Sequence, residues 1–255
     1  MIERLRHLAG TPCWVDTLQP DPLAATEFYG PLLGWSFDDA VPAPRAVAGG
    51  DYYTARLGGH RVAGVGQAPP GLRAAWLTHI RVDDIESAIS RAEAAGGACL
   101  AAPAAGAGTH GRAAVLTDAT GVPFCVQEAG ESAGAEVVDG PGTWAMSSLH
   151  STDMAESRRF YGAVFGWELD PVPGAPFSKW HLGGHVVGLL TEADGVSTPQ
   201  HWSVNFTVRD ADAVAEHALA LGGTAVLAPF DTPGFRNTVI ADPQGGVVAL
   251  SARTS

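Results

Sequence analysis

The chain repeats itself, and this repetition constrains its fold more than any other feature. Four stretches of the first half recur in the second half in the same order, each about 124–132 residues downstream. The paired stretches are 21–35 with 153–167, 57–60 with 182–185, 76–103 with 202–229, and 111–121 with 235–245. Within the first pair, the fragments Phe-Tyr-Gly and Gly-Trp align without a gap. A duplicated order of this kind indicates two tandem domains that share one fold.

The repeats also predict where the domains begin and end. We place the first domain at residues 1–128 and the second at residues 143–255. Segment 129–142 is polar and rich in glycine, has no counterpart elsewhere in the chain, and is therefore interpreted as a linker. A chain of 255 residues is long enough to give each domain its own core.

Each half has the local signals of strands and helices in alternation. Asp21 is a predicted N-cap, Gly34 a predicted C-cap, and apolar side chains between them recur at helical spacing. Asp153 is the predicted N-cap of the equivalent helix in the second half. Asp84 is the predicted N-cap of a second helix in the first half, and residues 211–221 form the counterpart of that helix in the second half. Short runs bounded by Gly or Pro predict strands at 52–57, 61–65, 113–116 and 124–127. The sequence therefore predicts an α+β fold in which the order strand, helix and three strands occurs four times.

The composition limits which classes of partner, and which cellular compartment, are expected for this chain. The net charge is −12, so clustered positive charge for nucleic acid or an anionic membrane is not expected. No apolar run approaches the roughly 18 residues of a membrane helix, and no secretory signal is visible. Three widely spaced cysteines, Cys13, Cys99 and Cys125, favour unpaired thiols in a reducing compartment. These features predict a cytoplasmic protein that binds neither nucleic acid nor membrane.

Four βαβββ units, with FYxxxxGW after the first strand and DPxG before the last, resemble the vicinal oxygen chelate superfamily. That superfamily includes glyoxalase I, extradiol dioxygenases, fosfomycin resistance enzymes and bleomycin-binding proteins. The resemblance covers residues 11–128 and 143–252, nearly the whole chain. It implies that two βαβββ modules pair into a cup-shaped mixed sheet with the helices outside and a ligand inside. It also implies a monomer, because the tandem supplies internally the domain pairing that single-domain relatives obtain by dimerising.

The resemblance also places a divalent metal ion in each cup, held by two histidines and a glutamate. Counting from the helix caps and from the glycine of the DPxG turn identifies the equivalent positions in this chain. They hold Trp14, Leu77 and Cys125 in the first half, and Met146, Ser203 and Ala249 in the second. A divalent ion needs several nitrogen or oxygen ligands, which one thiol among mostly apolar groups does not supply. We therefore expect no metal at these positions and no other cofactor.

Polar residues beside the empty ligand positions are the candidates for function. Asp16 and His79 each lie two residues beyond such a position, and we expect them to line one cup without touching each other. Asp16 is either a strand-end residue or a base. For the same geometric reason, we do not expect His150 and His201 to touch each other. The tryptophans either pack in the core or stack on a flat ligand. The candidate ligand-binding residues are Trp14, Asp16, Trp76, His79, Cys125, Trp144, Ser148, Trp202 and Asn205.

These residues favour a metal-independent protein that binds a small aromatic or apolar metabolite. The alternative is a metal-independent enzyme of secondary metabolism, hydroxylase-like or isomerase-like, in which Asp16 or His79 is the acid or base. A metal-dependent glyoxalase or extradiol dioxygenase is disfavoured, because the metal-ligating side chains are missing from both halves.

Overall fold

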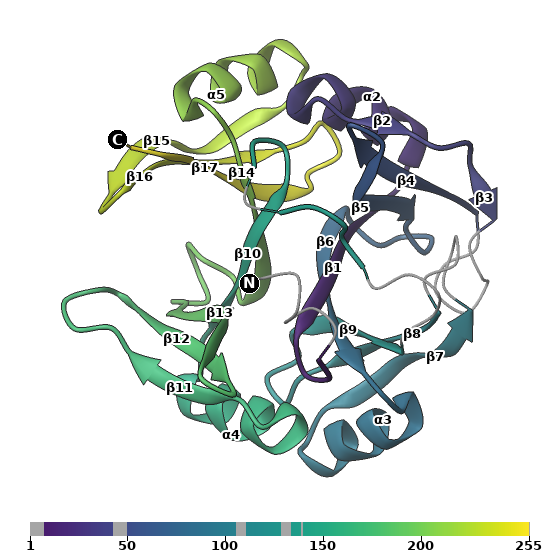
Figure 1. Ribbon diagram of the computed structural model, residues 1–255, viewed down its shortest axis with the longest axis vertical. Coiled ribbons are helices and arrows are strands. Elements are labelled where there is room, and N and C mark those ends of the chain that lie inside the picture. Colours follow the sequence, from purple (N-terminus) through teal and green to yellow (C-terminus); the bar gives the residue numbers. More distant parts are fainter. Residues whose placement is uncertain (1–7, 43–49, 106–110, 129–133, 139, 255) are drawn as a thin grey trace. The chain divides into compact units, whose positions relative to one another are not determined.

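The computed structural model describes residues 8–42, 50–105, 111–128, 134–138 and 140–254, and it contains four βαβββ modules in sequence (Figure 1). The first module comprises β1 (Pro12–Gln19), α2 (Pro22–Leu33), β2 (Ser36–Phe37), β3 (Val41–Pro42), β4 (Asp51–Leu57) and β5 (His60–Gln67). The second comprises β6 (Ala75–Val82), α3 (Ile85–Ala94), β7 (Ala98–Ala105), β8 (Arg112–Thr117) and β9 (Pro123–Glu128). The third comprises β10 (Trp144–Ser151), α4 (Met154–Phe165), β11 (Glu168–Pro171), β12 (Phe177–Leu182) and β13 (His185–Glu192). The fourth comprises β14 (His201–Thr207), α5 (Ala211–Ala220), β15 (Thr224–Thr232), β16 (Phe235–Ala241) and β17 (Val247–Arg253).

Each module contains parallel and antiparallel strand pairs and one helix, so the α+β class is confirmed. The predicted order of strand, helix and three strands holds in the last three modules, whereas the first module has a further two-residue strand, β3, which pairs with β4. The strand orders within the modules are β2-β4-β5-β1, β6-β9-β8-β7, β11-β12-β13-β10 and β14-β17-β16-β15. In every module the first strand pairs in parallel with the last, and the remaining pairs are antiparallel. A parallel pair needs a crossover connection, and the helix of each module belongs to that connection.

The structure confirms Asp21 and Gly34 as the caps of α2 and Asp153 as the N-cap of α4. The carboxylate of Asp21 accepts a hydrogen bond from the backbone N–H of Ala24, and α2 ends at Gly34 with φ of 74°. Asp153 caps α4 in the same way, and α4 ends at Gly166 with φ of 73°. Both glycines lie in the left-handed region, which residues with a Cβ seldom adopt.

The chain divides into two compact units, and each unit takes one module from each half. Unit 1 comprises Met1–Trp14, Leu77–Gly134 and Met146–Trp202, and so contains the second and third modules. Unit 2 comprises Val15–Trp76, Ala135–Ala145 and Ser203–Ser255, and so contains the first and fourth. Helices α3 and α4 are neighbours in unit 1, and α2 and α5 are neighbours in unit 2 (Figure 1). The boundaries at 128 and 143 remain predictions, and residues 129–133 and 139 of the expected linker lie outside the described residues.

The recurring tyrosines join the two modules of each unit, and the recurring tryptophans contact segments distant in sequence. In unit 2 the Tyr29 hydroxyl donates to Asp242 Oδ2 at 2.7 Å, although these residues are 213 positions apart. In unit 1 the Tyr161 hydroxyl donates to Asp118 Oδ2 at 3.1 Å. The two Gly-Trp tryptophans likewise donate to backbone carbonyls, Trp35 to Gly142 and Trp167 to Gly10, each at 2.7 Å. Each unit therefore has one tyrosine contact and one tryptophan contact, in agreement with the occurrence of both motifs twice in the sequence.

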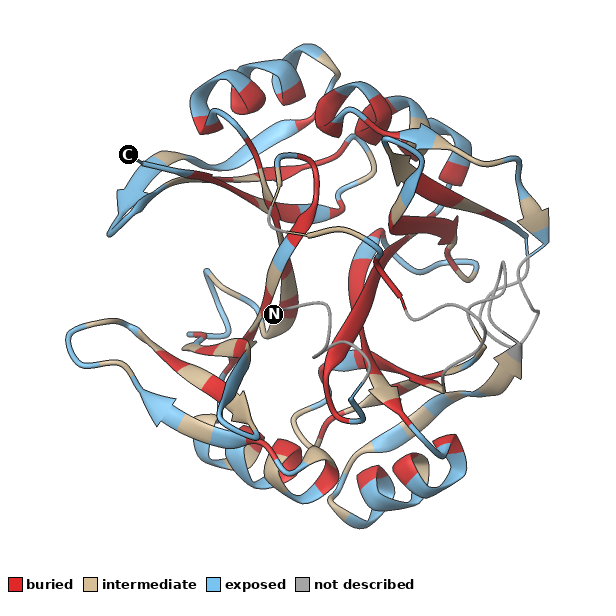
Figure 2. Cartoon of the chain, in the orientation of Figure 1, coloured by how far each residue is buried: buried red, intermediate tan, exposed pale blue. Residues whose placement is uncertain are grey.

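The sheet of each module has one face packed on its helix, and we call the opposite face the helix-free face. In the second module, Ile80 and Phe124 are fully buried in a core that includes Ile85 and Ala88 of α3. Because side chains alternate along a strand, their neighbours in sequence lie on the helix-free face. Figure 2 shows this alternation of buried and less buried residues along several strands. Within the described part of the chain, no helix is long and apolar enough to span a membrane.

Candidate functional site

The positions of the family's metal ligands hold side chains that do not suit a divalent ion. Trp14, Leu77 and Cys125 are all buried, and only the Cys125 thiol among them could bind a metal. The described residues contain no group of three or more His, Cys, Asp or Glu side chains arranged to hold an ion. The residues present therefore do not fit the metal that the fold family implies.

In unit 2, Asp16 forms a buried pair with Tyr52. The Tyr52 hydroxyl donates to Asp16 Oδ2 at 3.2 Å, and both residues are buried. Asp16 lies beside Gly64 in the parallel pairing of β1 with β5. A Cβ at Gly64 would lie 1.9 Å from the Tyr52 hydroxyl, and one at Gly66 would lie 2.8 Å from its ring. The two glycines make room for Tyr52, a residue that sequence reasoning missed although a Gly-x-Gly spacing on β5 was there to indicate it.

In unit 1, His79 lies beside Cys125 on the helix-free face of the second module. The two residues are direct partners in the parallel pairing of β6 with β9, and both are buried. Gln127 is on the same face two residues further along β9 and is also buried. The Cys13 thiol reaches this cluster as well, 3.6 Å from the His79 carbonyl oxygen and 4.0 Å from Gln127 Oε1. The cluster joins polar and polarisable groups that a ligand could contact. The predicted thiols are confirmed, since none of the three cysteines forms a disulfide.

The four tryptophans among the candidates are buried, and two of them have a defined structural role. The indole N–H of Trp76 donates to the Tyr29 hydroxyl at 3.0 Å, and that of Trp202 donates to the Tyr161 hydroxyl at 2.8 Å. Each indole also meets its tyrosine edge to face. Trp76 and Trp202 therefore position the tyrosines that join the modules, which is the packing alternative considered for them. A contact with ligand for Trp14 and Trp144 stays a prediction.

In the second half, the structure brings together two histidines that were expected to stay apart. The rings of His150 and His201 are stacked, with centroids 4.7 Å apart and planes at 4° to each other. Parallel ring planes cannot both contain one ion, so the pair is not arranged to chelate a metal. Burial, together with the neighbouring His201, lowers the pKa of His150 to about 4. Burial also lowers the pKa of His201, whose Nδ1 lies 2.7 Å from the Pro199 carbonyl oxygen. Both rings are therefore neutral near pH 7. Ser148 lies on the same face of β10 as His150 and is half-buried.

Asn205 begins a chain of hydrogen bonds across all four strands of the fourth module, in unit 2. Its amide donates to Ser251 Oγ at 2.8 Å, and that hydroxyl donates to Asn237 Oδ1 at 2.7 Å. The Asn237 amide in turn donates to Thr232 Oγ1 at 2.8 Å. The neighbours Phe206, Leu250 and Thr238 are fully buried, so the chain lies on the helix-free face. Asn205 Oδ1 is buried and has no hydrogen-bond partner among the described residues.

Three large apolar side chains are exposed on the same face. Leu227 is 51% exposed, and Phe230 and Phe235 are each 39% exposed. In the register of β15 with β16, Leu227 lies opposite Val239, Phe230 opposite Asn237, and Phe235 opposite Thr232. Figure 2 shows β15 exposed along most of its length. We call the surface formed by Asn205, Leu227, Phe230, Phe235, Asn237 and Ser251 the open face.

The first half has small residues where the open face has large ones. In the alignment of the two repeats, Ala101 corresponds to Leu227, Ala104 to Phe230, and Gly111 to Phe235. Exposed apolar side chains gain nothing from contact with water, so a cluster of them on one face indicates a surface that something else covers. The alignment of the two halves already contains this difference in size. Only the exposed fractions in the folded chain show that the larger side chains lie at the surface.

The chain belongs to the family of glyoxalase-like domains, which match residues 14–127 and 145–251. Among its relatives, CFP32 of Mycobacterium bovis is 34% identical over 258 residues, covering 98% of this chain and 97% of that protein. The name of CFP32 gives glyoxylase as an unproven activity. The anthracycline biosynthesis protein DnrV of Streptomyces peucetius is 33% identical over 261 residues, covering 94% of this chain and 92% of DnrV.

Solved structures of lower identity share the fold. The Mn(II)-bound glyoxalase from Novosphingobium aromaticivorans aligns with a TM-score of 0.64 at 16% identity, over 96% of this chain and 82% of the glyoxalase. The 2,3-dioxygenase LapB from Pseudomonas sp. KL28 aligns with a TM-score of 0.63 at 13% identity, over 97% of this chain and 94% of LapB. The predicted resemblance to the vicinal oxygen chelate superfamily is therefore confirmed for the fold and for the tandem of two domains.

Proposed function

We propose that this protein binds a flat aromatic metabolite on the open face of unit 2, without a metal ion. The observation that carries the proposal is the combination of three exposed apolar side chains with Asn205 Oδ1, for which the described residues supply no hydrogen-bond donor. An aromatic ring system covering Leu227, Phe230 and Phe235 would remove their apolar surface from water. A hydroxyl or amide N–H on the same ligand would satisfy Asn205 Oδ1, and a buried acceptor without a donor is costly.

The relatives support this class of ligand. DnrV is named for anthracycline biosynthesis, and anthracyclines are planar polycyclic compounds that carry hydroxyl groups. Both features match what the open face offers, an apolar surface beside a hydrogen-bond acceptor. The guanidinium of Arg253 lies 6.0 Å from the centre of the Phe235 ring and adds a positive charge at one end of this face.

Fluorescence titration with 1,4-dihydroxyanthraquinone tests the proposal, with matched variants that remove one exposed leucine each. Leu227→Ala should weaken binding roughly tenfold, the effect of losing most of one buried side chain. Leu219→Ala is the control, because Leu219 lies on α5 and is 52% exposed, against 51% for Leu227. Equal effects of the two variants, or no saturable binding of any hydroxylated aromatic compound, would overturn the proposal.

Metal independence rests on the side chains at the family's ligand positions, Trp14, Leu77 and Cys125 in the first half. Elemental analysis of protein purified without a histidine tag should find far less than one ion per domain. One tightly held ion per domain would reject this part of the proposal and would favour a metal-dependent enzyme.

The Asp16–Tyr52 pair supports a second candidate, a metal-independent enzyme that moves a proton on an enolisable substrate. Asp16 would accept the proton, and the Tyr52 hydroxyl would hold the carboxylate in place. Asp16→Asn should then abolish solvent-deuterium uptake into 1-indanone followed by NMR, and Tyr52→Phe should slow it. Exchange at the wild-type rate in Asp16→Asn would remove Asp16 from the mechanism, and His79→Gln would then test the other candidate.

A further inference from the structure

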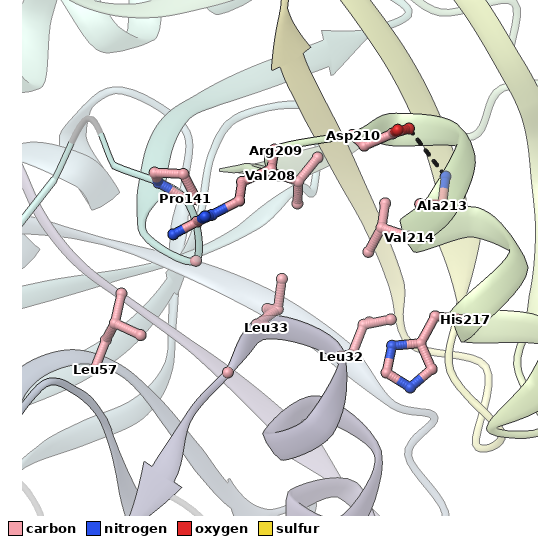
Figure 3. A pocket seen from close by; sticks show the side chains of 12 residues that line it. Leu32, Leu33, Leu57, Pro141, Val208, Arg209, Asp210, Ala213, Val214 and His217 are labelled. Atoms are coloured by element: carbon pink, nitrogen blue, oxygen red, sulfur yellow. Dashed lines mark hydrogen bonds between the residues drawn. The ribbon is translucent and has the colours of Figure 1, made fainter.

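Unit 2 contains a cavity of about 390 Å³ between the C-terminal end of α2 and the N-terminal half of α5. Figure 3 shows Leu32 and Leu33 of α2 facing Val214 and His217 of α5 across it, with Leu57 at one side. The volume is within the range of small-molecule sites, about 300–1,000 Å³. None of its lining residues belongs to the open face or to the Asp16–Tyr52 pair, so the cavity is a separate feature.

The equivalent region of unit 1 shows what is missing from unit 2. There the Nε of Arg91 on α3 donates to the Val164 carbonyl oxygen of α4 at 3.1 Å, so the arginine crosses between the two helices. Phe165 follows Val164 and packs against Tyr161 and Trp167. In the alignment of the repeats, His217 corresponds to Arg91 and Leu33 corresponds to Phe165. Both replacements are smaller, and together they leave space between α2 and α5.

The edge of this cavity carries an arginine that no carboxylate contacts among the described residues. Arg209 lines the cavity, is exposed, and forms no ion pair among the described residues. Asp210 also lines it, but its Oδ1 already caps α5 by accepting from the backbone N–H groups of Asp212 and Ala213 (Figure 3). His217 lies at the other end of the cavity, near Leu32. An arginine without an acidic partner beside an apolar wall suits a carboxylate on an apolar chain.

We infer that this cavity binds a small amphipathic carboxylate, with its apolar chain against Leu32, Leu33 and Val214 and its carboxylate on Arg209. The inference goes beyond the proposed function, because it concerns another site and another class of ligand. The apolar wall supplies most of the affinity by removing methyl groups from water. Arg209 supplies the preference for an acid over an alcohol of the same length.

Methyl NMR of leucine- and valine-labelled protein tests the inference with octanoate as the probe. Octanoate should produce saturable shifts in the methyl signals of Leu32, Leu33, Leu57 and Val214, while those of Leu227 remain in place. Arg209→Gln should weaken octanoate roughly two- to fivefold, as expected for an ion pair open to solvent. The neutral analogue 1-octanol should bind more weakly than octanoate to the wild type and equally to both proteins.

A double variant that copies unit 1 provides the matched control. Leu33→Phe with His217→Arg fills the cavity with the side chains that occupy the equivalent space in unit 1, and octanoate should then no longer shift Leu57 or Val214. Octanoate and 1-octanol binding equally well, with no effect of Arg209→Gln, would overturn the inference. Shifts confined to Leu227 and its neighbours would overturn it too, and would locate octanoate on the open face. Because Arg209 is exposed, the Arg209→Gln comparison remains decisive if the double variant does not fold.

Discussion

Removal of one hydroxyl from Tyr161 tests how the two modules of unit 1 are joined. This phenol accepts a hydrogen bond from the Trp202 indole at 2.8 Å and donates one to Asp118 Oδ2 at 3.1 Å. All three residues are buried. Burial, and the nearby charge of Asp118, raise the pKa of Tyr161 well above its usual value, so the hydroxyl remains a neutral donor. Tyr161→Phe keeps the ring and removes only these two hydrogen bonds.

The loss in the free energy of unfolding follows from the two buried groups that Tyr161→Phe leaves without their hydrogen bonds. The Trp202 N–H loses its acceptor, which costs about 1–3 kcal/mol for a buried donor. Asp118 Oδ2 loses the one donor it has among the described residues, and a hydrogen bond to a charged group contributes about 1.5–3 kcal/mol. The two effects share one hydroxyl and do not add fully. We therefore expect Tyr161→Phe to lower the free energy of unfolding by about 2–4 kcal/mol.

Tyr29→Phe in unit 2 is the matched comparison, and it should cost less. Its hydroxyl makes the same two bonds, to Trp76 and Asp242. Asp242 Oδ2 also accepts from Gln19 Nε2 at 2.7 Å, so it keeps one donor when the tyrosine hydroxyl is removed. The difference between the variants should be about 1 kcal/mol, the net contribution of one hydrogen bond. Urea denaturation followed by tryptophan fluorescence measures both values. Tyr53→Phe is the control, because Tyr53 lies on β4 and is only half-buried.

Two results would refute this reasoning. One is a Tyr161→Phe protein within about 0.5 kcal/mol of wild type, the size of an ordinary surface effect. The other is a larger loss for Tyr29→Phe than for Tyr161→Phe, because Gln19 would then not be supporting Asp242.

Three further perturbations test other parts of the structure. The folded chain keeps Tyr29 and Tyr161 protonated above pH 10, where the unfolded chain loses those protons. The free energy of unfolding should therefore be unaffected by these groups below pH 10 and should fall as the pH rises further. The fall should be less steep in either phenylalanine variant. The pKa of His150 is lowered from 6.5 to about 4. Its full contribution to the free energy of unfolding is therefore present above pH 6.5 and is lost as the pH falls towards 4. The free energy of unfolding should therefore drop over this range by about 1–3 kcal/mol, read as a fall in the thermal midpoint. The drop should be smaller in His150→Gln, although not absent, because burial also lowers the pKa of His201. Gly64→Ala would place a Cβ 1.9 Å from the Tyr52 hydroxyl, so it should displace the Tyr52 ring. The free energy of unfolding should fall by about 1–3 kcal/mol, and the near-ultraviolet circular dichroism should change. An unchanged spectrum would contradict the close contact.

Much of the fold could be predicted because its signals are local. The cap at Asp21, the left-handed glycine at Gly34 and the turn at Asp242 each act through backbone atoms within about four residues, so the sequence contains the whole interaction. Comparison of the two halves then supplied the module order, and with it the family. The replaced ligand positions, such as Trp14 and Leu77, were also readable in this way.

Other interactions depended on residues far apart in the chain. The repeated FYxxxxGW motif contains Tyr29 and Trp35, but nothing in the motif indicates that their hydrogen bonds go to Asp242 and Gly142. Sequence spacing does not encode such pairs, because any of several polar residues could have come within reach. The stacking of His150 on His201 was missed for the same reason.

The sequence by itself determined that two glyoxalase-like domains lie in tandem and that the family's metal-ligating side chains are replaced in both. Only the tertiary structure decided that each compact unit takes one module from each half, and that Leu227 and Phe230 are exposed while Asp16 and His79 are buried. Burial is a property of everything that surrounds a side chain, and those surroundings are assembled from distant segments. For that reason an alignment can locate a leucine on a strand, but only the folded chain shows whether that leucine remains open to a ligand.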